Sequence, residues 1–311
     1  MSKRYTDLNS YLRARFGCRV QKITLDAGLN CPNRDGSLSS DGCIYCNERG
    51  SGTGAHAQGL TITEQLRHGK AALFRRYKAQ KFMAYFQSFS NTYAPLEKLR
   101  QIYSEALDVE DIVGLSIGTR PDCINAPVLD LLESYARRYL IWIEYGLQSA
   151  HDRTLNFINR GHSFSDFENA VYATAGRGIK ICVHVILGLP GEQPRHMHQT
   201  ARILARLPID GIKLHLLYIV KGTRLEDLYK QGQYRCLDQL EYVALVGDFL
   251  ERLPSRIIIQ RLTGDPHREE LVAPMWSLKK SETLQLIKKS LEDRDTWQGK
   301  LADSDGHREE P

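Results

Sequence analysis

Residues 22–47 read KITLDAGLNCPNRDGSLSSDGCIYCN, an apolar, β-branched run that leads directly into a polar loop with three cysteines. The loop contains two Asp-Gly pairs, which favour tight turns and fold the chain back on itself. Folding the loop in this way brings Cys31 toward the closely spaced pair Cys43 and Cys46. The stretch therefore predicts a buried strand that ends in a metal-binding loop.

Three thiolates without an obvious fourth ligand suit an iron–sulfur cluster whose remaining iron is completed from outside the chain. The alternative is a structural zinc ion, which normally takes four protein ligands in a closed tetrahedron. Cys18 or His56 could supply that fourth ligand. Both kinds of site are consistent with the cysteine spacing.

The composition is that of a globular protein with a sizeable core. The 311 residues are 42% hydrophobic and 25% charged, and one α/β barrel accommodates a chain of this length. The seven cysteines show no disulfide framework, which predicts a reducing, cytoplasmic location. We find no apolar run suited to a signal peptide or a membrane span, and we expect no membrane association.

Positive charge is concentrated in the body of the chain. The formal net charge is +5, and residues 291–311 hold three basic and seven acidic side chains. The body therefore carries a net charge of +9. Such a charge is compatible with a polyanionic partner such as RNA, and it also occurs in proteins that bind no nucleic acid.

Apolar strand-like runs alternate with amphipathic helix-like segments along residues 1–253, which is typical of parallel βαβ units. The expected strands cover residues 22–29, 82–89, 112–117, 140–147, 179–187 and 212–220. The expected helices cover residues 62–78, 95–107, 126–138, 165–175, 196–207 and 237–253, with Ser165 as a helix cap. Six such pairs predict an α/β fold, an open, partial (β/α)6 TIM-type barrel.

The rhythm changes after residue 253. Residues 254–299 are expected to form a short C-terminal extension, with a strand at 256–262 and a helix at 278–291. Residues 300–311 are polar and predict a disordered tail.

Each expected strand is followed by a polar or glycine-bearing turn. After the cysteine loop these turns read QSFSNT, GTRPD, QS, GLPGE and KGT. Active sites of parallel barrels gather at the C-terminal ends of the strands, so the six turns predict one ligand site. Glu144, Asp122 and Cys123 also fall near this end and could act on a substrate, but we expect GTRPD to fix its loop through Pro121 and side-chain hydrogen bonds.

Several motifs follow one another around these turns: YFQSFSNTYAP, GTRPDC, EYGLQS, INRGH, VILGLPGE, VKGT and IQRLTGDP. Together with the cysteine loop, they resemble the radical S-adenosylmethionine (SAM) enzymes. The resemblance is to the branch of Elp3-like and coproporphyrinogen-dehydrogenase-like proteins. Within that branch it is to the YhcC-type family, over nearly the whole chain.

The resemblance implies two cofactors. In such enzymes three cysteines hold a [4Fe–4S] cluster, and the amino and carboxylate groups of SAM complete the fourth iron. Cys31, Cys43 and Cys46 would be the cluster ligands here, and an electron donor such as a flavodoxin or ferredoxin would reduce the cluster. One electron then cleaves SAM to methionine and a 5′-deoxyadenosyl radical, which abstracts hydrogen from the substrate. The protein orients these cofactors and excludes water.

The resemblance also assigns SAM contacts by position. Gln148 stands at the SAM ribose or carboxylate, and Arg160 faces the carboxylate, which its planar fork can grip at two points. His184 occupies the place where some relatives have an aspartate that binds the ribose hydroxyls. Ser88, Ser90 and Thr92 would lie in the turn that cradles the methionine amine, where many members have glycines that this chain lacks. Gly188 and Gly222 would flank the adenine.

Three functions are consistent with these features. The first, which we favour, is a radical SAM enzyme that acts on RNA, namely on the wobble-uridine side chain of tRNA. The second is a radical SAM enzyme with a small-molecule or tetrapyrrole-like substrate. The third is a non-catalytic zinc- or cluster-binding protein, which predicts a fourth protein ligand and no SAM cleavage.

Overall fold

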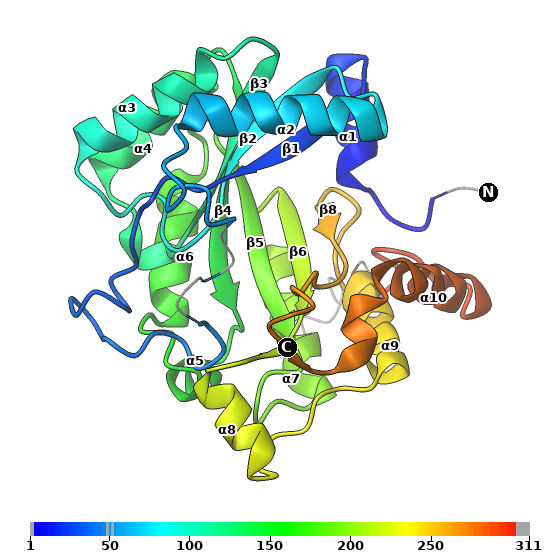
Figure 1. Cartoon of the computed structure of the whole chain (residues 1–311). Helices are drawn as coiled ribbons and strands as arrows, with labels where there is room; N and C mark the ends of the chain where they lie inside the picture. The colour runs from blue at the N-terminus through cyan, green and yellow to red at the C-terminus, as the bar shows by residue number, and fades with distance from the viewer. Residues whose placement is uncertain (1–2, 48–49, 51–52, 303–311) are drawn as a thin grey trace, which may run out of the picture.

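A computed structural model describes residues 3–47, 50 and 53–302, and its centre is a seven-stranded, curled parallel sheet (Figure 1). The strands follow one another in the order β1-β2-β3-β4-β5-β6-β8, with β1 and β8 at the two edges. They are β1 (Val20–Leu25), β2 (Lys81–Phe86), β3 (Ile112–Thr119), β4 (Leu140–Gln148), β5 (Lys180–Leu187), β6 (Gly211–Leu216) and β8 (Ile258–Arg261). The predicted α/β fold with a partial barrel is confirmed.

Most of the helices pack on the outer face of this sheet, and α1, α5 and α8 lie at its two ends (Figure 1). The α-helices are α1 (Leu8–Phe16), α2 (Ile62–Tyr77), α3 (Leu96–Leu107), α4 (Ala126–Ala136), α5 (Asp152–Phe157), α6 (Phe164–Thr174), α7 (Pro194–Arg206), α8 (Arg224–Lys230), α9 (Gln239–Glu251) and α10 (Lys280–Asp293). Two single 3₁₀ turns, η1 (Pro121–Cys123) and η2 (Met275–Leu278), accompany them. Along the described ranges, none of the helices combines the length and apolarity that a bilayer crossing requires.

The structure adds helices α1, α5 and α8 to the expected pattern and differs from it in three further respects. The expected strand at 212–220 splits, because β7 (Ile219–Val220) leaves the main sheet and pairs with β9 (Leu271–Ala273). The expected C-terminal strand joins the main sheet as β8, next to β6. Helix α6 begins after Ser163, whose hydroxyl and Asp166 form a capping box, so the cap expected at Ser165 is wrong by two residues.

The C-terminal part packs against the barrel. Helix α10 lies on α9, and Leu291 of α10 belongs to the main hydrophobic core. Residues 300–302 form a turn in which the Leu301 N–H donates to the Glu251 carbonyl at 2.8 Å. Residues 303–311 of the expected tail lie outside the described part of the chain.

One end of the barrel interior is filled by apolar side chains. Trp142 on β4 is fully buried there beside Met83 of β2 and Leu12 of α1. The Tyr11 ring of α1 packs edge-on against Trp142, with the ring centroids 6.1 Å apart. Helix α1 therefore closes the end where the strands begin, and the opposite end is left for the turns that follow the strands.

A glycine in β3 sets how closely the strands approach. A Cβ atom at Gly114 would lie 2.0 Å from the Leu140 carbonyl oxygen of β4, whereas one at Gly118 would meet nothing nearer than 3.3 Å. We expect Gly114→Ala to lower the free energy of unfolding by about 3 kcal/mol or more, because backbone cannot move aside cheaply. Gly118→Ala is the matched control on the same strand and should cost less than about 1 kcal/mol. Urea denaturation measures both, and equal losses would contradict the packing argument.

Candidate functional site

The cysteine loop follows β1 and extends to α5 and α8 at the C-terminal ends of the strands (Figure 1). Cys31 and Cys43 are buried, and Cys46 is partly buried. Burial and the charge of Cys43 raise the pKa of the Cys46 thiol to about 11, and the charge of Cys31 adds to the rise. The three thiols therefore lie close enough to influence one another electrostatically.

Residues 158–160 of the INRGH motif hold this loop in place. The Ile44 N–H donates to the Ile158 carbonyl at 3.1 Å. The Asn33 amide donates to the Asn159 carbonyl at 2.6 Å, and the Asn159 amide donates to the Gly42 carbonyl at 2.7 Å. Asn159 adopts a left-handed backbone with φ of 52°, a conformation that asparagine tolerates better than most residues. The motif thus anchors both cysteine-bearing halves of the loop.

Arg160 joins the end of β4 to a cysteine. Its Nη2 and Nε atoms donate to the Gly146 carbonyl at 2.8 and 3.2 Å, and its Nη1 atom lies 3.5 Å from the Cys43 sulfur. Burial would lower the pKa of Arg160, but the charge of Cys43 raises it, so the guanidinium stays positive beside the thiol. The sequence predicted a contact to the SAM carboxylate, and the structure adds a contact to a cysteine.

A second buried arginine holds Arg160 in position. Arg120 of the GTRPDC motif is 2% exposed, and its Nη1 atom donates to the Arg160 carbonyl at 2.6 Å. The rest of its guanidinium grips the Asp122 carboxylate at two points, at 2.9 and 2.7 Å. The expectation that GTRPD fixes its loop through side-chain hydrogen bonds is confirmed by this pair, whereas the bond from Arg120 to the Arg160 carbonyl was not expected.

The turn after β2 has a glycine-like backbone without glycine. Ser88 and Phe89 have φ of 152° and 58°, values that favour glycine. The Asn91 amide maintains the turn by donating to the Ser88 and Gly118 carbonyls at 3.0 and 2.9 Å. The turn therefore adopts, without glycine, a backbone conformation that glycine residues adopt most easily.

The other predicted contacts in this turn are buried. Ser90 is fully buried, and its N–H donates to the Asn30 carbonyl at 3.1 Å. The Thr92 hydroxyl lies 2.6 Å from the Thr119 hydroxyl and donates to the Cys123 carbonyl. Both side chains therefore contribute to the packing of the turn.

Gln148 and His184 lie along the barrel interior below the cysteine loop. Gln148 ends β4 with φ of 78°, and its amide lies over Gly146, next to the Arg160 guanidinium. The His184 Nε2 atom is hydrogen bonded to the Glu144 carboxylate at 2.8 Å, and its pKa is lowered to about 4 by burial and the Lys213 charge. This bond occupies one of the two ring nitrogens.

The two predicted glycines occupy turns with positive φ. Gly188 has φ of 88°, its carbonyl accepts from the Tyr234 hydroxyl at 2.8 Å, and a Cβ atom there would collide with Leu237. Gly222 has φ of 74°, and its N–H donates to the Glu226 carboxylate at 2.8 Å. Both positions require glycine for backbone reasons alone.

The donor set fits an iron–sulfur cluster. It consists of buried or partly buried thiols with two arginines beside them. One is Arg160, and the other is Arg34, whose Nη1 atom donates to the Cys46 carbonyl and whose charge lowers the pKa of the Cys46 thiol. The described residues contain no group of three or more His, Cys, Asp or Glu side chains arranged around a single metal ion. Cluster ligands bind separate irons and need not converge on one point. Cys18 lies before β1, at the other end of that strand, and so cannot be a fourth ligand.

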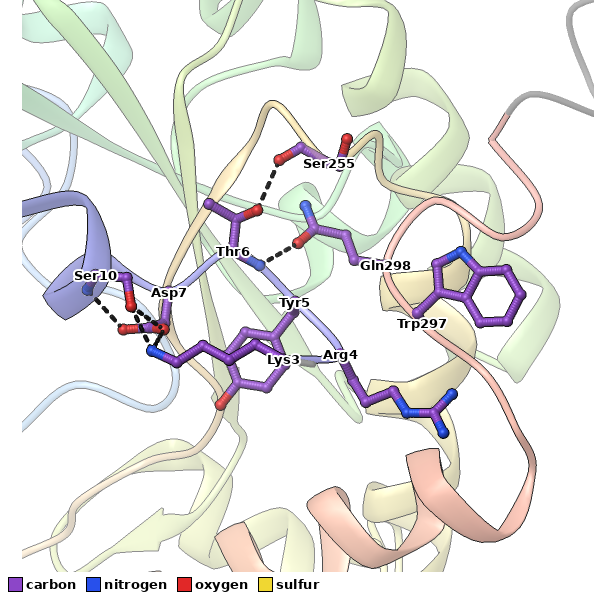
Figure 2. Close-up of a pocket in the computed structure, with 9 residues that line it drawn as sticks. All are labelled: Lys3, Arg4, Tyr5, Thr6, Asp7, Ser10, Ser255, Trp297 and Gln298. Carbon is purple, nitrogen blue, oxygen red and sulfur yellow. Dashed lines mark hydrogen bonds and ion pairs between the residues drawn. The ribbon is translucent and has the colours of Figure 1, made fainter. Parts of the chain in front are cut away.

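A pocket of about 500 Å³ lies away from the cysteine loop, between the N-terminal segment and the C-terminal turn (Figure 2). Its polar groups bind one another: the Thr6 N–H donates to the Gln298 amide oxygen at 3.0 Å, and the Thr6 hydroxyl donates to the Ser255 carbonyl at 2.9 Å. Figure 2 shows the Trp297 ring at the rim, pointing away from Thr6. None of the predicted site residues lines this pocket. The hydrogen bonds across it hold the N-terminal segment against the C-terminal part of the chain.

Comparison with known proteins identifies the fold and the cofactors. A model of the radical SAM superfamily matches residues 31–204, and a model of the radical SAM C-terminal domain matches residues 209–293. Protein YhcC of Escherichia coli K12 is 40% identical over 266 residues, which is 85% of this chain and 85% of that protein. This chain belongs to the radical SAM superfamily. It is a radical SAM enzyme, with a [4Fe–4S] cluster and SAM as cofactors, in the branch that the sequence resembled.

Two further matches are more distant. A tRNA uridine(34) acetyltransferase of Dehalococcoides mccartyi is 31% identical over 157 residues, which is 49% of this chain and 33% of that protein. The solved structure of an N-terminally shortened Elp3 from Methanocaldococcus infernus matches with a TM-score of 0.69 at 16% identity. That match covers 92% of this chain and 68% of the Elp3 chain, and it shows a shared fold.

Asn159 offers a test of the loop anchor. Asn159→Ala removes the hydrogen bond to Gly42 and strains the left-handed backbone, so we expect a loss of about 1–3 kcal/mol of stability and at least half of the bound iron. Asn159→Gly removes only the hydrogen bond and should have a smaller effect. Asn156→Ala, at an exposed position of α5, is the control. Iron per protein after anaerobic reconstitution measures the outcome, and full occupancy in Asn159→Ala would refute the anchor.

Proposed function

We propose that Cys31, Cys43 and Cys46 hold the [4Fe–4S] cluster, with SAM completing the fourth iron. The observation that carries this assignment is the buried contact of Arg160 with the Cys43 sulfur in a three-cysteine loop. A positive guanidinium offsets the negative charge of cluster thiolates and is one means of tuning the cluster potential. When bound, these cofactors supply the 5′-deoxyadenosyl radical, and the protein supplies position, charge compensation and a dry environment.

We assign SAM to the strand ends beside the cluster. Gln148 and Arg160 lie next to each other and can offer an amide and the remaining guanidinium N–H to the SAM carboxylate or ribose. His184 can offer the ribose its second ring nitrogen, since Glu144 occupies the first. The remaining contacts belong to two sets: Ser88, Ser90 and Thr92 shape the amine cradle through their backbone, and Gly188 and Gly222 flank the adenine.

Substitution of single cysteines tests the ligand set. We expect Cys43→Ala to abolish the broad cluster absorbance near 400 nm and 5′-deoxyadenosine formation, because the cluster loses one of three protein ligands. Cys182→Ala is the matched control, since Cys182 is fully buried in the apolar end of the barrel. It should keep both signals and lose only some stability. A cluster that survives Cys43→Ala, or about one zinc per chain in place of iron, would overturn the assignment.

For the substrate we propose tRNA, at the side chain of the wobble uridine. The partial likeness to a tRNA uridine(34) acetyltransferase supports this substrate. Exposed cations at the C-terminal ends of α1 and α2 form no ion pair with described residues: Arg13, Arg15, Arg75, Arg76 and Lys78. They lie at the end of the barrel where the strands begin, so they would hold the tRNA backbone away from the reaction site. Cations of this kind bind the phosphate backbone independently of sequence. A flavodoxin or ferredoxin in the cytoplasm would supply the electron.

Nucleoside analysis tests the substrate. In a strain that lacks the protein and any redundant pathway, one modified wobble uridine should disappear and a longer or less processed form should accumulate. Wild-type protein should restore the profile, whereas Cys43→Ala should not. Unchanged tRNA profiles, together with SAM cleavage that responds to a small molecule, would favour the small-molecule or tetrapyrrole-like alternative.

A further inference from the structure

The barrel interior contains ionisable side chains, most of which the cofactor assignments leave without a function. Four of them form an interior ionic layer, from strands β1, β4, β5 and β6: Lys22, Glu144, His184 and Lys213. Glu144 accepts from Lys22 Nζ at 2.7 Å, from His184 Nε2 at 2.8 Å and from Lys213 Nζ. In a flat sheet β1 and β4 would be about 14 Å apart, so the bond between them must cross the concave interior.

The layer is buried but reachable. Glu144 is 1% exposed and Lys213 is 3% exposed, while the side chains of Lys22 and His184 keep 14% and 17% of their surface exposed. Lys213 also donates to the Tyr85 hydroxyl at 3.0 Å, and its ammonium lies 4.1 Å from the Tyr85 ring centroid. One side of the network therefore contacts solvent inside the barrel, and the other side is sealed by aromatic packing.

The charges in this region do not balance. Burial alone would raise the pKa of Glu144, but the charges of Lys213 and Lys22 hold it well below its usual range, so the carboxylate is charged. Burial lowers the pKa of Lys213 to about 8, which leaves it mostly protonated at neutral pH. Arg261 on β8 is paired with Lys213 in strand register and forms no ion pair with described residues. Three cations therefore face one carboxylate, and His184 is neutral.

Two side chains beside the layer also have unused polar atoms. His215 Nε2 and Gln260 Nε2 are buried and make no hydrogen bond to any described residue. Burial, and after it the charge of Arg261, holds the pKa of His215 well below its usual range. The ring is therefore neutral and can donate a hydrogen bond from one of its two nitrogens. A buried polar atom without a partner costs about 1–3 kcal/mol. A region with excess positive charge and unpaired hydrogen-bond donors is suited to bind an anion.

We propose that this region is a binding site for an anionic group of the substrate, a carboxylate or a phosphate, held by Lys213, Arg261 and His215. Glu144 precedes Gly146 by two residues on the same face of β4, and the Gly146 carbonyl binds Arg160 beside Cys43. Two residues span about 7 Å of strand, so the ionic layer lies about that far along β4 from the level at which Gly146 holds Arg160. The inference rests on the proposed reaction site at the strand ends, but it does not require the substrate to be tRNA.

Anion binding can be measured without turnover. The full chain with reconstituted cluster is unfolded thermally in sodium acetate, sodium phosphate or sodium chloride of equal ionic strength. A ligand that binds only the folded state raises the Tm, and we expect a rise of about 2 °C or more over chloride with one of the two probes. A rise with acetate assigns the site to a carboxylate, and a rise with phosphate assigns it to a nucleotide phosphate.

Variants locate the bound anion. Arg261→Gln removes a cation that pairs with no carboxylate of the described residues, so the protein should fold and the Tm rise should disappear. Lys213→Met should have the same effect on the rise while also lowering the basal Tm. Lys70→Met is the matched control, because Lys70 lies on α2 outside the barrel and pairs with Asp111 at 3.0 Å. No rise with either probe, or a rise that Arg261→Gln retains, would overturn the proposal.

Discussion

Hydrogen bonds to one buried carboxylate cross the interior of the curled sheet. Glu144 of β4 is bound by cations of β1 and β6 and by the His184 ring of β5. A buried charge that loses its partners costs several kcal/mol, so the sheet cannot flatten without leaving Glu144 unpaired. Lys22 extends the same network to the other edge strand, since its ammonium also donates to Gln260 of β8 at 2.7 Å. The interior of the half-barrel is thus held at a fixed width by hydrogen bonds across it.

The interior changes in character along the strand direction. Trp142 lies in the apolar end, Glu144 lies in the ionic layer two residues later, and the Gly146 carbonyl binds Arg160 after two more. Since alternate residues of a strand face the same side, this order follows directly from the sequence of β4. Burying an ion pair is seldom the most stable solution, and an apolar middle layer would fold at least as well. The ionic layer is therefore better explained by ligand binding than by stability.

Sequence reasoning succeeded where the signal was local. Apolar runs located the strands of the barrel, and the turns after them lie at the C-terminal ends of the strands as expected, because both depend on residues that are neighbours in the chain. It missed contacts between distant segments, such as Lys22 with Glu144 and Asn33 with Asn159. It also read the missing glycines near Ser88 as a departure from the family pattern. The backbone adopts the glycine-like conformation nonetheless, because Asn91 supplies hydrogen bonds that offset the strain.

The residues assigned to the cofactors and those assigned to the anion fall in two different family matches along the chain. The cysteine loop, Arg120, Gln148 and Arg160 all fall within residues 31–204, the segment that matches the radical SAM superfamily. Lys213, His215 and Arg261 fall within residues 209–293, which match the C-terminal domain. Strand β8 brings the second group into the same interior as the first, because it pairs with β6 and so extends the curled sheet by one strand. On the assignments proposed above, the cluster ligands and the anion-binding cations therefore lie in different segments of the chain. The two segments still meet at the cysteine loop, because the Leu225 N–H of α8 donates to the Ile44 carbonyl at 2.8 Å.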